Sequence, residues 1–202
     1  AMGDRSFTTL YYLGVSQYAD NWPYGARDNL LEAHKKNPMD VNVLYYLAKA
    51  CARSSWKEEG IAYMNKAFDM VVPTDSMMIR LYDGLLECYK FHTKADPYEK
   101  IEVMKEAYSY TKKYTLFYQI AEIYDYQKDY VNAVHYYEKY MALVPKNKQA
   151  ALDSEGNPLP NVDTMYQKAR RRVEKIKVED FFRNGAHDDY FEPKVIRTQT
   201  KK

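Results

Sequence analysis

The side chains best suited to chemistry are few and widely separated in this sequence. Of the four histidines, only His187, which Asp188 and Asp189 follow, has neighbours that commonly bind metals. We interpret this trio as part of an exposed tail, with weak metal binding as the alternative. The sequence contains no glycine-rich phosphate loop, no GxSxG and no HExxH motif. We therefore predict that the protein is not an enzyme and uses neither a metal nor a cofactor.

The two cysteines, Cys51 and Cys88, are too few for a disulfide framework or a zinc site. Both lie in apolar stretches with helical spacing, and free cysteine is among the most often buried residue types. We predict two buried thiols. A single disulfide between neighbouring helices is the alternative.

Composition narrows the class of protein. The 202 residues suffice for one or two domains, and 46% hydrophobic with 29% charged residues fits a globular chain. Thirty basic and 28 acidic residues leave a net charge of +2, which argues against a nucleic-acid partner. Seven glycines and eight prolines are few for the many tight turns of an all-β fold. No apolar run approaches the roughly 20 residues of a membrane span.

The sequence repeats with a period of 34 residues. Six pairs of similar residues occur at this offset: Leu10 with Leu44, Leu13 with Leu47, Gly14 with Ala48, Ala26 with Gly60, Leu30 with Met64, and Ala33 with Ala67. A further copy has apolar residues on two successive helix faces, at Phe117, Ile120, Ala121 and Tyr124 and then at Ala133, Tyr137 and Tyr140. Between them we place a weaker copy with a longer turn at 91–97, carried by Tyr82, Leu85, Leu86, Tyr89, Ile101, Met104 and Ala107.

This pattern resembles the tetratricopeptide repeat, in which Leu-Gly or Leu-Ala and an aromatic residue are followed by alanine, an aromatic, alanine and proline. Segment 114–147 matches best and departs at Tyr140, where the family has a small residue. The resemblance covers about 7–147 and implies an all-α fold, a right-handed superhelical α-solenoid of antiparallel helix pairs within 4–147. The expected segments are helix pairs at 7–40, 41–74, 77–112 and 114–147, a connector at 148–162, a capping helix at 163–183 and a tail at 184–202.

Small residues recur where the two helices of a pair would cross. They are Gly14, Ala48 and Ala121 on first helices and Ala26, Gly60 and Ala133 on second helices. Small side chains let two backbones approach closely, so we expect tight crossings. Pro38, Pro73 and Pro145 are expected to end second helices, because proline cannot continue a helix.

The polar connector ends at Asp163, which we expect to cap a helix. Its segment 153–157 faintly resembles a calcium loop but lacks the distal glutamate, so we interpret it as a turn. Apolar residues follow at helical spacing, with two phenylalanines near the end: Met165, Ala169, Val173, Ile176, Phe181 and Phe182. We interpret this helix as a cap that covers the last repeat. Its basic residues leave a nucleic-acid or anionic partner as the alternative.

The 22 tyrosines are a large excess. Tyr82, Tyr89, Tyr124 and Tyr137 are expected to fill space between helices, whereas Tyr11, Tyr45 and Tyr118 suit either packing or binding. In a repeat solenoid the first helices line a concave groove. Residues off their packing faces are the groove candidates: Tyr11, Val15, Tyr18, Tyr45, Lys49, Ala52, Arg53, Arg80, Asp83, Glu87, Lys90, Tyr118, Glu122, Asp125 and Tyr126. Such a surface suits an extended peptide or a partner helix.

Some members of the family hold acidic chaperone tails in a basic clamp. The resemblance puts Tyr11, Val15, Tyr46, Arg80 and Gly84 at the clamp positions, and only Arg80 is compatible. We therefore predict no clamp of that type.

The leading hypothesis is a non-enzymatic module that binds a protein or peptide in the groove. The alternatives are a homo-oligomeric spacer and a carbohydrate-binding accessory protein, since the composition is reminiscent of exported proteins from gut bacteria. The sequence does not predict the cellular compartment. Ala1-Met2-Gly3 is typical of a cloning remnant, and a signal lost ahead of Asp4 would place the protein in the periplasm or at a membrane.

Overall fold

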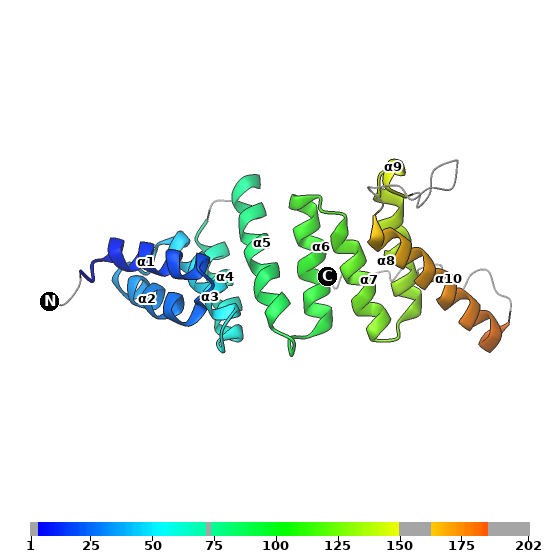
Figure 1. The fold of residues 1–202 in the computed structure, drawn as a ribbon, viewed down its shortest axis with the longest axis horizontal. Coiled ribbons are helices and arrows are strands. Elements are labelled where there is room, and N and C mark those ends of the chain that lie inside the picture. Colours follow the sequence, from blue (N-terminus) through cyan, green and yellow to red (C-terminus); the bar gives the residue numbers. More distant parts are fainter. Residues whose placement is uncertain (1–3, 72–73, 150–162, 186–202) are drawn as a thin grey trace, which may run out of the picture. The chain divides into compact units, whose positions relative to one another are not determined.

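The chain folds as a series of α-helices. The computed structural model describes residues 4–71, 74–149 and 163–185, and every regular element within those ranges is a helix (Figure 1). The predicted all-α class is therefore confirmed. Residues 150–162 and 186–202, which include the calcium-like segment and His187, lie outside the described residues, as does Pro73.

The helices divide into two compact units, Ala1–Thr111 and Lys112–Lys202. Each unit is described by itself. The described part of unit 1 holds six helices: α1 (Phe7–Ala19), α2 (Pro23–Lys36), α3 (Val41–Ala52), α4 (Lys57–Asp69), α5 (Asp75–Phe91) and α6 (Pro97–Thr111). Unit 2 holds α7 (Thr115–Tyr126), α8 (Tyr130–Leu143), the short α9 (Lys146–Gln149) and α10 (Thr164–Asn184).

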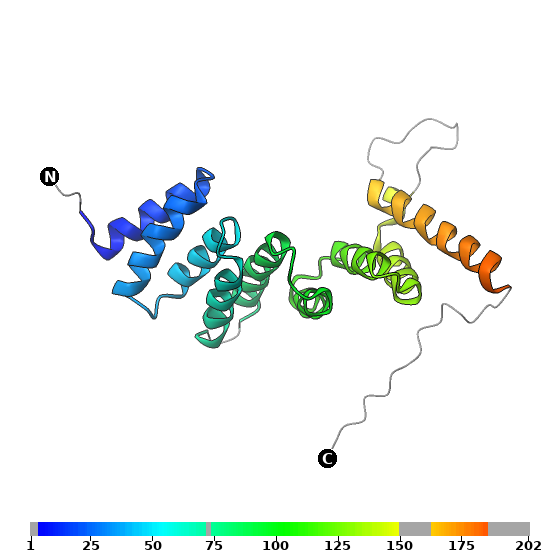
Figure 2. The ribbon, with the colours of Figure 1, turned by 90° about the horizontal axis from the view of Figure 1, so that it is seen from below.

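In unit 1 consecutive helices pack as antiparallel pairs, α1 with α2, α3 with α4 and α5 with α6. The first helices of the pairs also contact one another, because α3 lies against both α1 and α5 (Figure 2). The turn between α5 and α6 spans 92–96 and is longer than the turns 20–22 and 53–56 of the earlier pairs, as the sequence predicted.

The 34-residue equivalence is visible in the core. Leu10, Leu44, Leu30 and Met64 are all buried at matching places in the first two pairs. Leu13 is the exception, because its side chain is 45% exposed whereas its equivalent, Leu47, is fully buried. The difference arises because the first pair covers Leu47, while no described helix precedes α1 to cover Leu13.

The small residues stand at the helix crossings, as predicted. A Cβ atom on Gly14 would lie 2.5 Å from Cγ of Leu30 and 3.2 Å from the backbone oxygen of Ala26. A Cβ atom on Gly60 would lie 2.8 Å from the backbone oxygen of Ala48. Each crossing of the first two pairs therefore combines one glycine with one alanine, and the glycine brings two backbones into near contact.

Helix ends follow local sequence rules. The carboxylates of Asp40 and Asp129 accept backbone N–H groups at the starts of α3 and α8, which satisfies donors that lack a partner inside the helix. Pro38 and Pro145 each follow the end of a second helix by two residues, as expected. The turns before α2 and α8 contain Asn21 and Lys128 at positive φ, 59° and 62°.

The core of unit 2 is rich in tyrosine. Tyr124, Tyr137 and Tyr140 are all buried between α7 and α8. Tyr140 replaces the small residue expected there, and its ring lies 5.4 Å from that of Tyr118 and 6.0 Å from that of Tyr114. Tyr82 and Tyr89 are likewise buried in unit 1. The four tyrosines predicted to fill space between helices therefore do so.

Helix α10 packs on α8. Asp163 is its N-cap and accepts the backbone N–H groups of Met165 and Tyr166. The apolar side is formed by the buried residues Ala169, Val173 and Ile176. It stops there, since Val178, Phe181 and Phe182 are exposed. Within the described ranges no helix has the length and apolar character to cross a bilayer.

Arg172 ties α10 to α7. Its Nε and Nη2 atoms each donate to the Asp125 carboxylate at 2.6 Å. Replacing Arg172 with methionine leaves that carboxylate, whose side chain is 14% exposed, without its forked partner. We expect α10 to lose about 1–2 kcal/mol of protection against hydrogen exchange, measured on α10 peptides by mass spectrometry.

Arg170→Met is the matched control, because its ion pair with Glu174 lies within α10 on an exposed surface. Its effect should stay below about 0.5 kcal/mol. Equal protection of α10 in the two variants would contradict a docking role for Arg172.

Candidate functional site

The predicted groove residues fall in both units. Tyr11, Tyr18, Tyr45, Lys49 and Arg80 lie on α1, α3 and α5 of unit 1, and Arg53 directly follows α3 as its C-cap. Tyr118, Glu122 and Tyr126 lie on α7 of unit 2. Three of the unit 1 residues, Tyr18, Lys49 and Arg53, contact a further candidate, Glu87 of α5. We call the six unit 1 residues and Glu87, with Tyr46 of α3, the first-helix face.

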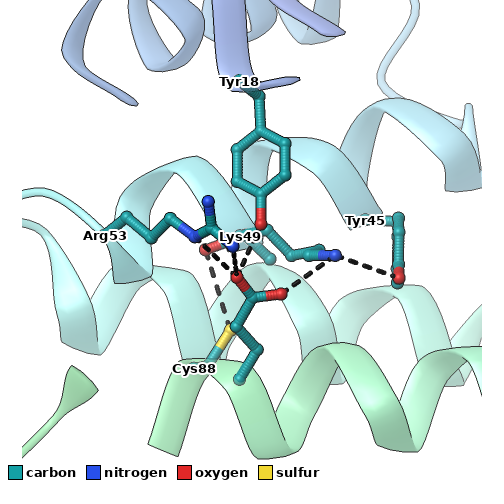
Figure 3. Close-up of polar contacts among 7 residues, drawn as sticks. Tyr18, Tyr45, Lys49, Arg53 and Cys88 are labelled. Carbon is teal, nitrogen blue, oxygen red and sulfur yellow. Dashed lines mark hydrogen bonds and ion pairs between the residues drawn. The ribbon is translucent and has the colours of Figure 1, made fainter. Parts of the chain in front are cut away.

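Glu87 is the centre of the first-helix face. Its carboxylate accepts the hydroxyl of Tyr18 at 2.6 Å, Nε of Arg53 at 2.7 Å and Nζ of Lys49 at 2.9 Å. Figure 3 shows Tyr18, Lys49 and Arg53 converging on this carboxylate. Tyr18 comes from α1, Lys49 from α3, Arg53 from the C-cap of α3 and Glu87 from α5. One carboxylate therefore joins three successive first helices.

The electrostatics keep this cluster charged at neutral pH. Burial alone would raise the pKa of Glu87, but the hydrogen bonds from Tyr18 and Lys49, the Lys49 charge and the hydrogen bond from Arg53 hold that pKa below its ordinary value. Burial alone would lower the pKa of Lys49, but Glu87 and Tyr45 hold it above its ordinary value. Burial and the Glu87 carboxylate both raise the pKa of Tyr18, so its hydroxyl stays protonated and donates.

Aromatic rings flank the cations. The guanidinium of Arg53 lies 4.5 Å from the centre of the Tyr18 ring, and that of Arg80 lies 4.4 Å from the Tyr45 ring and 5.9 Å from the Tyr46 ring. Lys49 Nζ lies 5.0 Å from the Tyr45 ring. Such contacts are favourable because the ring faces carry negative potential. The rings therefore hold the long basic side chains in fixed positions.

Arg80 differs from the other cations of the face. Its Nη1 donates to Oδ1 of Asn42 at 2.9 Å, which is a neutral acceptor. The guanidinium has five N–H donors in a rigid plane, so several remain for another molecule. Tyr11 and Tyr46 are partly exposed beside it, with ring centres 6.3 Å apart. Arg80, Tyr11 and Tyr46 are thus the members of the face best placed to contact a ligand.

Tyr18 and Tyr45 are less accessible than Tyr11 and Tyr46. Both are buried, so they support the face from beneath. Tyr118 of unit 2 is buried as well, and its ring packs edge-on against that of Tyr137 at 5.6 Å. Burial and the nearby Glu122 raise the pKa of Tyr118 to about 12. Of the tyrosines that the sequence left open, Tyr45 and Tyr118 therefore pack inside, and Tyr11 reaches the surface.

Of the remaining unit 2 candidates, Asp125 binds Arg172 of α10. Glu122 and Tyr126 are both exposed on α7, and Tyr126 is the more so at 86%. Sequence position alone identified Glu87, Lys49 and Arg53 as candidates. It gave no sign that Lys49 and Arg53 both bind the carboxylate of Glu87. Tyr46 was missed as a binding candidate, although it is adjacent to Tyr45.

The thiols are not suited to nucleophilic chemistry. Cys51 and Cys88 are both buried and unbridged, as predicted. Burial raises the pKa of Cys51 to about 11 and that of Cys88 to about 12, so the reactive thiolate is scarce at neutral pH. Within the described ranges no three His, Cys, Asp or Glu side chains are grouped as a metal site.

Comparison with known proteins rests on structure. No protein-family model and no curated protein sequence matches the chain. The solved structure of a tetratricopeptide repeat protein from Parabacteroides merdae superposes with a TM-score of 0.61 at 13% identity, over 87% of this chain and 62% of that one. The chain has the tetratricopeptide-repeat fold.

Two further structures share the tetratricopeptide fold with this chain. Kinesin-light-chain-like repeats from Podospora anserina give a TM-score of 0.58 at 12% identity, covering 90% of each chain. The MamA protein gives 0.56 at 18% identity, over 92% of this chain and 98% of MamA. At these identities the likeness shows the fold alone.

Proposed function

We propose that this tetratricopeptide-fold chain is a non-enzymatic module that binds a protein or peptide on the first-helix face of unit 1. The observation that carries the proposal is the position of Arg80 beside Tyr11 and Tyr46, with donors left over after its hydrogen bond to Asn42. Arginine and tyrosine are the residue types that most often dominate binding energy at protein interfaces.

The Glu87 cluster supports this proposal through pre-organisation. It fixes α1, α3 and α5 relative to one another, so the exposed tyrosines and Arg80 need little ordering when a ligand binds. Ordering costs of about 0.5–1.5 kcal/mol per mobile side chain are thereby reduced. An extended peptide fits the face, because its backbone carbonyls can accept from the guanidinium while its apolar side chains lie on tyrosine rings.

A peptide-display library selected on the immobilised full chain tests the proposal. Selected peptides should lose at least about tenfold in affinity for Arg80→Ala and for Tyr46→Ala, measured by fluorescence polarisation. Arg80→Lys separates charge from shape, and we expect it to recover little affinity, since lysine lacks the planar fork.

Lys66→Ala is the matched control, because Lys66 is an exposed cation on the second helix α4. It should leave affinity unchanged. Peptides that bind Arg80→Ala and Tyr46→Ala as well as the parent chain, with unchanged melting of both variants, would refute the proposed face.

A further inference from the structure

At the junction between the first two helix pairs, apolar and aromatic residues of the second pair pack against the first pair. The guanidinium of Arg27, from α2, lies 3.7 Å from the centre of the Trp56 ring, and the Tyr24 ring meets the same indole edge-on at 5.9 Å. Leu47 is fully buried in the same cluster, against Tyr18 and Leu30 of the first pair. Residues of the second pair at these positions are thus covered by the pair before them.

The equivalent residues of the first pair are uncovered. Leu13 and Trp22 precede Leu47 and Trp56 by 34 residues and are their equivalents in the first pair. Leu13 is 45% exposed and Trp22 is 58% exposed. Tyr12, the equivalent of Tyr46, is 65% exposed. We propose that this surface, the open end face, is where a second copy of the chain docks. It consists of Tyr12, Leu13, Ser16, Gln17, Trp22 and Asn29.

Trp22 is a rigid platform within the open end face. A Cβ atom on Gly25 would lie 2.9 Å from two atoms of the indole, so the ring rests directly on the glycine backbone. One face of the indole is held against Gly25, and more than half of the Trp22 surface stays accessible. A large apolar group held still in this way loses little entropy when a partner covers it.

The polar members of the face favour a docked copy over a further stacked repeat. At the covered junction the packing residues include Ala50, Cys51 and Tyr63. The open end face has Ser16, Gln17 and Asn29 at those positions, and the Asn29 amide donates to Gln17 at 2.8 Å. An apolar centre beside hydrogen-bonding groups is typical of interfaces between separately folded partners.

Charge makes the face compatible with itself. None of its six residues is of a charged type, so two copies facing each other bring no like charges together. A twofold axis is the commonest symmetry of protein oligomers. It would bring Leu13 and Trp22 of one copy against the same patch of the other copy. The inference does not depend on the first-helix face.

Sedimentation velocity on the full chain tests the inference over about 5 to 500 µM. The parent chain should shift from monomer to dimer, and Leu13→Glu should weaken dimerisation at least about tenfold, because the twofold axis brings both new charges into the interface. Phe182→Glu, on a more exposed apolar residue of α10, 81% against 45% for Leu13, should leave dimerisation unchanged. A chain that stays monomeric throughout, or equal losses in the two variants, overturns the inference.

Cross-linking provides a second readout. The native thiols are buried, so Leu13→Cys adds the accessible one. Under mild oxidation it should form a disulfide between copies much faster than Phe182→Cys, because dimerisation holds the two introduced thiols near each other. Equal cross-linking of the two variants would overturn the twofold arrangement.

Discussion

Glu87→Ala is expected to lower the free energy of unfolding of unit 1 by about 2–3 kcal/mol. The substitution leaves Lys49 and Arg53 facing each other without the carboxylate that neutralises them, and it removes the acceptor of the Tyr18 hydroxyl. The side chains of Glu87 and Lys49 are each only 17% exposed, so water replaces little of what is lost. Breaking a fully buried pair costs more, about 3–5 kcal/mol.

Tryptophan fluorescence during urea unfolding measures this effect in the right place, since both tryptophans of the chain, Trp22 and Trp56, belong to unit 1. Glu87→Gln is the matched variant, because it keeps an oxygen for Tyr18 and removes only the charge. We expect it to lie between the parent chain and Glu87→Ala. An alanine variant as stable as the parent would show that the three first helices do not depend on this carboxylate.

Acid should erase the difference between the parent chain and Glu87→Gln. The pKa of Glu87 is held below its ordinary value of 4.5 in the folded chain. Its contribution is therefore fully present above about pH 4.5 and is lost as the pH falls through the folded pKa. Glutamine does not titrate, so the gap between the two unfolding curves should close in that window, while other acidic groups affect both proteins alike.

The repeat pattern predicted the helices and their tight crossings well, because these depend on local spacing. Ala48 and Gly60 could be placed opposite each other from the period alone. The Glu87 cluster could not be predicted in the same way. The pattern puts Tyr18, Arg53 and Glu87 on one side of successive helices, but whether their long side chains meet depends on how far neighbouring helices are offset.

Sequence periodicity also assumes that every repeat has a neighbour. This assumption fails at the ends, where the same residue type has a different environment. Leu13 and Leu47 are identical in type and register, yet only Leu47 is covered. Phe181 and Phe182 continue the apolar character of α10 past Ile176 and are exposed. Tyr11 and Tyr118, which the sequence treated as parts of one groove, belong to separate compact units, and the common groove stays a prediction.

Gly60→Val is expected to have a still larger effect, a loss of at least about 3 kcal/mol in the unfolding free energy of unit 1. A Cβ atom there would lie 2.8 Å from the backbone oxygen of Ala48 and 3.1 Å from the backbone nitrogen of Ala52. Backbone atoms within a packed helix cannot rotate away, so α3 and α4 must separate. Gly60→Ala should cost less, about 1–2 kcal/mol, because alanine regains up to about 1 kcal/mol of helix propensity.

Gly84→Ala separates backbone contact from simple crowding. Its Cβ atom would also come close to other atoms, at 2.5 Å from Cε of Met64 and 2.7 Å from Cε2 of Tyr45. Both are side-chain atoms, and the methionine can adopt another rotamer, so we expect a change within about 1 kcal/mol. The same fluorescence-detected unfolding compares the two alanine variants directly. If Gly60→Ala were no more harmful than Gly84→Ala, the pairing of α3 and α4 would not depend on backbone approach, and the small residues at the equivalent crossing of α1 and α2 would need another explanation.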